Sequence, residues 1–301
     1  MGSHGPDDYL RPFYVERVAD ADVVVPNPDP EVQVPSGYSQ INLMQKIRFK
    51  PNNNWDFQYG FHYSKTSEYA RYDRHIRYRS NGQPRYGEWS YGPQKWSMNN
   101  FTVSNTSSSI LYDQLTIRLA HQYFEESRID RNINNAVRRI RTEKVNALSV
   151  NLDMIKATGE KNRVYYGLEA VQNDVDSRGR NENIETGTSA AGPYRYPQAQ
   201  WASYALYVNN QYKLSEKTLL LAGLRYNQFT LDADFDTSFY PFPFTTAELN
   251  KGSLTGSAGI VYRPTPDWVV SGNIARAFRS PNVDDMGKVF DSEPGAVTVP
   301  N

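Results

Sequence analysis

The feature that most constrains this chain is the segment 51–64, PNNNWDFQYGFHYS, in which aromatic and non-aromatic residues alternate strictly after a turn. A side-chain period of two predicts a β-strand with one oily face and one wet face. The oily face consists entirely of rings, most of which carry a polar tip: Trp55, Phe57, Tyr59, Phe61 and Tyr63. Such rings suit a surface that meets lipid and headgroups better than a sandwich core, which favours Val, Ile and Leu. The segment therefore predicts a strand of a transmembrane β-barrel.

The composition is compatible with that prediction. The mean hydropathy is −0.70, and no apolar run approaches the ~18 residues that a membrane helix needs. Membrane barrels nevertheless show such averages, because only every second residue of a strand faces lipid. The 33 basic and 33 acidic residues balance, so bulk charge does not indicate a nucleic-acid partner. Cysteine is absent, which excludes disulfides, thiolate metal sites and cysteine nucleophiles.

Alternation recurs along the chain and predicts five antiparallel hairpins, with strands of about ten to thirteen residues. The predicted strand pairs are 39–50 with 54–65, 96–104 with 113–125, 145–156 with 163–173, 201–213 with 218–229, and 254–263 with 268–278. The connections within pairs are short, apart from 105–112, whereas those between pairs are long: 66–95, 127–144, 174–200 and 230–251. Short periplasmic turns and long external loops are the asymmetry of outer-membrane barrels. The alternative is a soluble β-sandwich or a β-solenoid, although compact domains seldom contain several loops beyond ~15 residues.

The ends of the chain do not have the pattern of barrel strands. Residues 1–37 include four prolines between positions 26 and 35, which oppose regular structure, and we interpret them as an extracellular loop segment. Residues 38–279 form the predicted partial barrel, and 280–301 the start of a further extracellular loop. About ten strands by themselves would leave two bare sheet edges in lipid, so we expect them to be part of a larger barrel. The first six residues contain no secretory signal.

Three segments resemble the TonB-dependent outer-membrane receptors, particularly those of Bacteroidetes-type bacteria. The segment 277–282, AFRSPN, resembles the G-F-R-A-P box at the top of a late barrel strand, with Ala277 in place of Gly and Ser280 in place of Ala. Its matching positions are Phe278, Arg279 and Pro281, followed by Asn282. The segments 166–170 (YGLEA) and 222–226 (AGLRY) also fit the family, in order and at a spacing appropriate to strands.

The resemblance implies a barrel of about 22 strands in the outer membrane of a Gram-negative bacterium. It implies a plug domain and C-terminal strands that this chain does not contain. The expected partners are outer-membrane lipid, the TonB complex acting through the missing plug domain, and a small metal-chelate ligand. No cofactor, nucleic-acid partner or enzymatic activity is expected. The implied function is TonB-energised uptake of a scarce solute, above all a ferric siderophore. The alternatives are a passive channel or porin, a haem or cobalamin receptor of the same fold, and an adhesin.

The best candidate for ligand contact is the loop 66–95, in which arginines alternate with aromatic residues. We predict that its ligand-binding residues are Arg71, Tyr72, Arg74, His75, Arg77, Tyr78, Arg79 and Trp89. Arginine offers a fixed fork of donors for carboxylate or catecholate oxygens, and tyrosine adds rigid area with a polar tip. The alternative is a solvated loop, or one that contacts anionic sugar headgroups. A second basic cluster, Arg138, Arg139, Arg141 and Lys144, is interpreted as headgroup contact or simple solvation.

Haem and calcium are further hypotheses. A haem receptor needs an imidazole ligand, and His75 is the one exposed candidate, but no histidine follows Phe278 as it does in the haem branch of the resembling family. The motif D-x-D-x-D at Asp232, Asp234 and Asp236 is a weak calcium candidate, because the glycine and glutamate of an EF-hand loop are missing. Solvated loop carboxylates are the alternative. The neighbouring aromatic segment 239–244 is expected either to clasp an apolar ligand or to pack across the barrel mouth.

Overall fold

The computed structural model describes residues 10–289 and 297–298. The long strands are β3 (Gln40–Phe49), β4 (Trp55–Thr66), β7 (Lys95–Asn105), β8 (Gln114–Asn132), β9 (Val137–Ala157), β10 (Asn162–Asn183), β12 (Gln198–Ser215), β13 (Thr218–Asp234), β14 (Thr246–Tyr262) and the shorter β15 (Val270–Ala275). The smaller elements are β1 (Phe13–Val18), β2 (Ala21–Pro26), β5 (Tyr69–Ala70), α1 (Tyr72–His75), β6 (Tyr86–Tyr91), β11 (Ser189–Gly192), α2 (Val283–Met286), β16 (Lys288–Val289) and β17 (Val297–Thr298). No helix of the described residues is long and apolar enough to cross a membrane.

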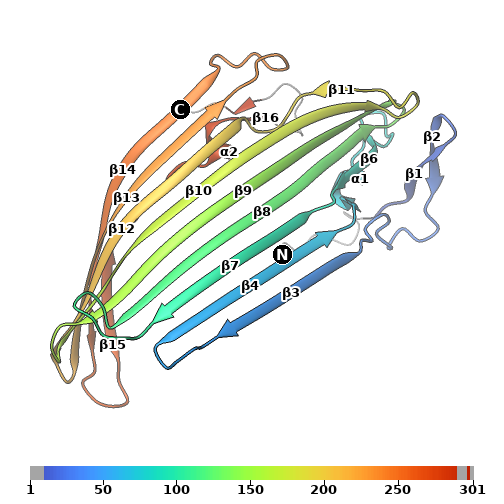
Figure 1. Ribbon diagram of the computed structural model, residues 1–301. Helices are drawn as coiled ribbons and strands as arrows, with labels where there is room; N and C mark the ends of the chain where they lie inside the picture. Colours follow the sequence, from blue (N-terminus) through green and yellow to red (C-terminus); the bar gives the residue numbers. More distant parts are fainter. Residues whose placement is uncertain (1–9, 290–296, 299–301) are drawn as a thin grey trace.

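The long strands form one continuous sheet in the order β3-β4-β7-β8-β9-β10-β12-β13-β14-β15. Every neighbour in this path is antiparallel, as expected for a chain of hairpins. Figure 1 shows the sheet as a tilted, curved wall with short turns at its lower left and longer segments at its upper right. We call these the turn end and the loop end. The predicted all-β architecture of five consecutive hairpins is therefore confirmed.

The outward face of the wall is apolar and exposed. The register places the predicted oily positions in rows across neighbouring strands, for example Leu119 opposite Val150 and Val150 opposite Ala170. Their exposure is high, with Leu168 at 50% and Leu254 at 59%. A water-soluble sheet would cover such a belt, whereas a membrane barrel presents it to lipid. The predicted side-chain parity is confirmed.

The inner face of the wall is polar and carries ion pairs between strands. Glu169 of β10 accepts a hydrogen bond from the Arg225 guanidinium of β13 at 2.6 Å. Arg118 of β8 pairs with Asp153 of β9, and the Asp153 carboxylate also accepts a hydrogen bond from the Tyr207 hydroxyl. These charges pair within the wall, so the inner surface is hydrophilic without a strong charge of one sign.

The strands are longer than the sequence predicted, and the loops are correspondingly shorter. β9 contains 21 residues and β10 contains 22, against a prediction of about twelve. The connection predicted at 127–144 shrinks to residues 133–136 between β8 and β9. Towards the loop end both faces of the strands carry polar side chains, so hydrophobicity no longer alternates. The backbone ladder nevertheless continues, because hydrogen bonding between strands does not depend on which side chains they carry.

The predicted loop 66–95 is also folded onto the wall. β6 pairs with the upper part of β8 and β7 with its lower part, so that Tyr91 lies opposite Arg128 and Lys95 opposite Glu125. β6 and β7 thus act as one bent strand, interrupted at Gly92-Pro93. Gly92 has φ +122°, and a Cβ there would lie 2.8 Å from the Glu68 Cα, so only glycine fits the bend.

A cluster of buried apolar side chains lies on the inner face near the loop end. It includes Phe229 and Leu231 of β13, Phe235 and Phe242 beyond it, and Met286 of α2. The ring centroids of Phe235 and Phe242 lie 5.1 Å apart. Tyr240, Phe242 and Phe244 of the aromatic segment 239–244 are therefore part of an internal packing cluster, whereas Phe239 is exposed.

Candidate functional site

An arginine–aromatic cluster lies on the inner face at the loop end. It consists of Arg71, Arg74, Trp89, Tyr91 and Arg128. The Arg71 guanidinium carbon lies 5.2 Å from the Trp89 ring centroid and 5.7 Å from that of Tyr91. Arg74 lies 5.6 Å from the Trp89 centroid, and Arg128 lies 5.6 Å from the Tyr91 centroid. Two rings thus hold three guanidinium groups in a continuous strip.

The position of the cluster follows from strand pairing. Trp89 lies opposite Asp130 of β8, and Tyr91 opposite Arg128, both on the side of the wall that carries Arg118. The short helix α1 then places Arg71 and Arg74 above the same rings. The Arg71 backbone N–H donates to the Trp89 carbonyl at 3.0 Å, and the Arg71 Nη1 donates to the Tyr91 hydroxyl at 2.9 Å. These contacts hold α1 against β6.

An inner-face pocket of about 390 Å³ adjoins the cluster at Arg128. Its lining combines rings, acids, amides and one guanidinium from several strands: Phe124, Glu126, Arg128, Glu143, Asn173, Tyr196, Trp201 and Asn282. The Arg128 Nη2 lies 3.1 Å from the Glu126 Oε1. Such a pocket has apolar walls with a few convergent polar groups, as small-molecule sites have.

The segment 277–282, which resembles the G-F-R-A-P box, leads directly into α2, and α2 begins at this pocket. Asn282 is the N-cap of α2, and its side chain accepts a hydrogen bond from the Asp285 backbone N–H at 3.0 Å. The Asp285 carboxylate accepts one in return from the Asn282 backbone N–H at 3.0 Å. Arg279 also pairs with Asp285 at 3.2 Å. This capping box turns the chain back onto the inner face, where Val283 is buried.

The structure divides the eight predicted ligand-contact residues into three groups. Arg71, Arg74 and Trp89 meet in the arginine–aromatic cluster. Tyr72 and His75 point into the packed underside of the loop, with exposures of 8% and 6%. The other three, Arg77, Tyr78 and Arg79, lie in the turn beyond α1, away from the cluster. The Tyr78 ring packs edge-on against Phe13 of β1 at 5.4 Å.

His75 is buried rather than exposed, which corrects its prediction as an exposed haem ligand. Its Nε2 lies 3.0 Å from the Trp89 carbonyl oxygen, to which the neutral ring donates. Burial, together with the nearby positive charge of Arg11, lowers the pKa of His75 to about 4. Its Nε2 is tied to the backbone and its Nδ1 is buried, so the ring orients the loop and presents no accessible nitrogen to a ligand.

Sequence reasoning missed Arg128, Tyr196 and Trp201 as members of the site. Arg128 lies in the segment 127–144, for which the sequence predicts a loop, and Tyr196 and Trp201 come from the connection before β12 and from β12 itself. Period-two alternation could have revealed Arg128 if it had been followed past Glu125, because Arg128 has the parity of the inner-facing Arg118. No sequence signal joins Tyr196 to that position.

The three aspartates of the calcium candidate, Asp232, Asp234 and Asp236, do not lie together in a loop as predicted. Asp232 and Asp234 belong to β13 and share its outward face, whereas only Asp236 follows the strand. The Asp236 carboxylate accepts a hydrogen bond from the Ser238 backbone N–H at 2.8 Å. Within residues 10–289 and 297–298, no group of three or more carboxylates or imidazoles is arranged to hold a metal ion.

Comparison with known proteins identifies the architecture. A family model described as "TonB dependent receptor-like, beta-barrel" matches residues 8–301, which is nearly the whole chain. No curated protein matches the chain in sequence.

Solved structures match the wall as well. The copper transporter OprC gives a TM-score of 0.66 at 12% identity, covering 82% of this chain and 38% of that one. The unliganded ferric citrate transporter FecA gives 0.58 at 14% identity, covering 80% and 36%. The hemophore receptor HasR of Serratia marcescens, with its hemophore and heme, gives 0.59 at 13% identity, covering 88% and 40%. Such identities show the fold alone, and the chain spans about two fifths of these proteins' lengths.

Proposed function

The chain belongs to the TonB-dependent receptor β-barrel family of the Gram-negative outer membrane, and on that premise we propose that it forms the ligand-capturing wall of an active-transport receptor. The solute is an anionic metal chelate, in the first place a ferric siderophore. The observation that carries this proposal is the arginine–aromatic cluster on the inner face, beside a pocket of about 390 Å³. Because barrels of this kind have long loops outside the cell, the cluster lies at the extracellular mouth.

The chemistry of the cluster fits such a ligand. Arg71, Arg74 and Arg128 bring three guanidinium groups to one strip, where Arg71 also pairs with Asp73 at 2.7 Å and Arg128 with Glu126 at 3.1 Å. Guanidinium forks match carboxylate or catecholate oxygens in pairs, so an anionic ligand would compete with these two carboxylates. The rings of Trp89 and Tyr91 hold the guanidinium groups in place, which lowers the conformational entropy lost on binding. Trp89 is buried under Arg71 and Arg74, so the ring surface for an aromatic chelator comes from the half-buried Tyr91 and from Trp201 in the pocket.

The names of the structural neighbours support a metal-containing solute. One is a transporter of copper, one a transporter of ferric citrate, and one a receptor in complex with a hemophore and heme. Haem is the weaker alternative for this chain, because His75 is buried and bonded to the backbone. Energy transfer from the TonB complex, through a plug domain beyond this chain, is part of the same proposal.

A passive channel is the competing function. The conductance of planar bilayers that contain the receptor distinguishes such a channel from an active-transport receptor. The complete receptor would be purified and titrated with ferric citrate, a ferric catecholate siderophore, haemin and Cu²⁺, with binding followed by calorimetry. The proposal expects one anionic chelate to bind in the micromolar range or tighter, and planar bilayers containing the receptor to remain closed. Steady conductance without binding of any of these solutes would establish a porin instead.

A further inference from the structure

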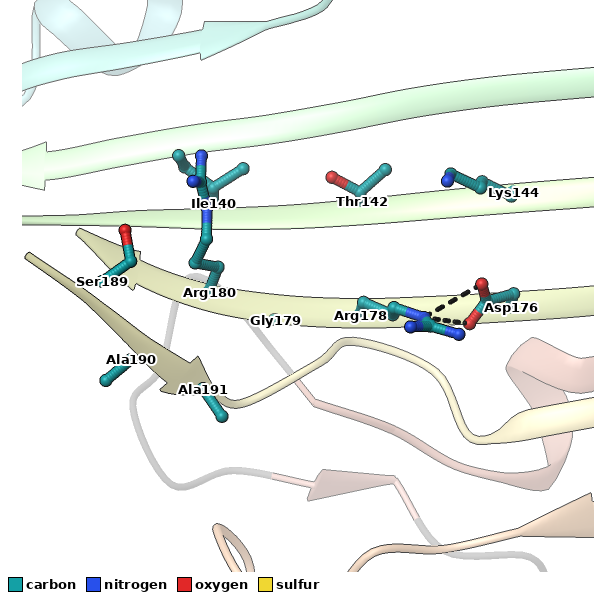
Figure 2. A pocket seen from close by; sticks show the side chains of 10 residues that line it. All are labelled: Ile140, Thr142, Lys144, Asp176, Arg178, Gly179, Arg180, Ser189, Ala190 and Ala191. Carbon is teal, nitrogen blue, oxygen red and sulfur yellow. Dashed lines mark hydrogen bonds and ion pairs between the residues drawn. The ribbon is translucent and has the colours of Figure 1, made fainter.

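The outward face of the wall is apolar over only part of its height. Near the loop end, β9 and β10 carry charged side chains such as Lys144 and Arg178 (Figure 2). Below them, the apolar outward residues of β9 run from Leu148 to Met154. These are six residues apart, or about 15 Å along the membrane normal at a strand tilt of about 40°. The apolar band of an outer-membrane barrel is about 25 Å tall, so β9 alone does not fill it.

The turn 106–113, between β7 and β8, carries further apolar side chains at the turn end. It is longer than the turns 158–161 and 216–217 at the same end. Ile110 is 93% exposed and Leu111 is 61% exposed. Single exposed apolar residues are ordinary on protein surfaces. These two are adjacent, however, and the turn that carries them is held in a defined shape.

Ser109 organises the tip of this turn. Its backbone N–H donates to the Tyr112 carbonyl at 2.7 Å. Its Oγ accepts hydrogen bonds from the backbone N–H groups of Leu111 at 3.2 Å and of Tyr112 at 3.0 Å. Because these bonds close a compact loop around Ser109, the side chain of Ile110 is left pointing away from the turn.

The turn is bent onto the lipid-facing side of the wall. The Lys156 Nζ of β9 donates to the Ser109 carbonyl at 2.6 Å and to the Asp113 carboxylate at 2.8 Å. Lys156 has the same outward parity as the apolar positions of β9. One strand farther along, the Tyr166 hydroxyl of β10 donates to the Leu111 carbonyl. The turn therefore reaches across β9 to β10 outside the barrel, instead of continuing along the strands into the periplasm.

Tyr166 gives the height at which the tip lies. It stands in the outward row of the sheet, between Met154 of β9 and Val208 of β12. Tyrosines on the lipid-facing side of a barrel keep the ring in the apolar band and the hydroxyl at its margin. Since that hydroxyl bonds the Leu111 carbonyl, Leu111 and its neighbour Ile110 lie at the periplasmic margin of the band.

We propose that the turn 106–113 is a membrane anchor, which inserts the side chains of Ile110 and Leu111 among the acyl chains of the periplasmic leaflet. The two side chains extend the apolar surface below Met154, where the outward row of β9 ends. The Lys156 charge stays at the bilayer surface, compensated by Asp113. The anchor sets how deeply the barrel sits in the membrane, because moving it towards the periplasm would expose both side chains to water. It is independent of the solute that the receptor transports.

The test places a fluorescent reporter at the tip of the turn in the complete receptor. This chain contains no cysteine, so Ile110→Cys offers a labelling site without competition from the rest of the chain, and labelled wild type measures the background. The NBD-labelled receptor is reconstituted into phosphatidylethanolamine–phosphatidylglycerol vesicles. Separate vesicles contain lipids with a nitroxide quencher at a shallow or at a deep carbon of the acyl chain. Heat-modifiable electrophoretic mobility shows that each variant is a folded barrel.

Two further variants provide reference environments with the same label. Leu168→Cys lies in the apolar band and reports a lipid environment. Glu216→Cys lies on the turn 216–217, where the native side chain is 88% exposed, and reports an aqueous turn at the same end of the wall. Because all variants carry the same label, any attraction of the label itself to lipid affects Glu216→Cys equally.

We expect the emission of Ile110→Cys to be shifted to the blue, close to that of Leu168→Cys. Quenching by the two nitroxides should place its label about 5–10 Å below the headgroup boundary, so the shallow nitroxide quenches it more strongly than the deep one. Emission and quenching equal to those of Glu216→Cys would overturn the proposal, because the tip would then lie in water. Blue-shifted emission that neither nitroxide quenches would also overturn it, since protein would then cover the tip. Leu111→Cys repeats both measurements at a second position and decides the question if Ile110→Cys does not assemble.

Discussion

Asp22 of β2 and Arg131 of β8, 109 residues apart, form a two-pronged ion pair with Nη1–Oδ2 and Nη2–Oδ1 distances of 2.7 and 2.9 Å. The Asp22 side chain is fully buried, and that of Arg131 is 2% exposed. The Arg131 Nε also donates to Glu88 of β6 at 3.0 Å. This network fastens the β1–β2 hairpin to the wall at the extracellular end.

Replacement of Asp22 by Asn should release the β1–β2 hairpin from the wall. Breaking one side of a buried pair costs about 3–5 kcal/mol, because it leaves Arg131 partly uncompensated. Hydrogen exchange of the amides in 13–26 should become at least 100-fold faster, while those of β9 and β10 remain protected. Unchanged protection in 13–26 would show that the pair does not hold the hairpin. Arg48→Ala, which breaks the exposed pair with Asp56, is the control and should leave this protection unchanged.

Acidification should loosen the segment around His75. Its pKa is about 4 in the folded protein, against an ordinary 6.5, so the unfolded segment binds more protons between these values. The contribution of neutral His75 to the free energy of unfolding of this segment is therefore fully present above about pH 6.5. It falls by up to ~3 kcal/mol as the pH drops towards 4. Hydrogen exchange of residues 71–91 measures this loss. In His75→Gln the pH dependence should disappear, and its persistence would assign the effect to another group.

The variant Arg71→Ala/Arg128→Ala should bind the chelate identified by titration at least 100-fold more weakly, because two charge-assisted contacts are lost. The variant Arg77→Ala/Arg79→Ala removes the same charge from the neighbouring turn, outside the cluster, and should bind like the wild type. Calorimetry on both folded receptors makes the comparison. Equal weakening in both variants would mean that the loop acts through its overall charge rather than through the arginine–aromatic cluster.

Arginine at Phe57 should impair insertion of the barrel, because a cation on the lipid-facing side near mid-membrane costs ~2–4 kcal/mol. Arginine at the adjacent Gln58 points inward and should be tolerated. The amount of heat-modifiable receptor in outer membranes measures insertion. The same yield of both variants would contradict the outward parity of β4. Phe61→Arg provides a second lipid-facing position with the same expectation.

Several features could be predicted from sequence because they depend on local periodicity. Alternation of apolar and polar residues in segments such as 55–63 predicted which side chains face outward and which face inward. The short turns predicted which strands pair as hairpins. A register shift by one residue would exchange the two faces, so the hydrophobic pattern specifies the register strongly. Strand length was not predictable in the same way, because beyond residues such as Glu125 the ladder continues through polar residues.

The sequence by itself determined that this chain builds a membrane-facing β wall. Lipid on one side of the wall and polar groups on the other impose a period of two on side-chain hydrophobicity along each strand, and this period is visible in the sequence. Only the tertiary structure decided which side chains of the loop 66–95 form the site. The pairing of β6 with β8 brings Trp89 and Tyr91 beside Arg128, whereas His75 is buried on the opposite side of the same loop. Loop residues carry no repeating pattern, so their neighbours are set by contacts distant in sequence, which only the fold specifies.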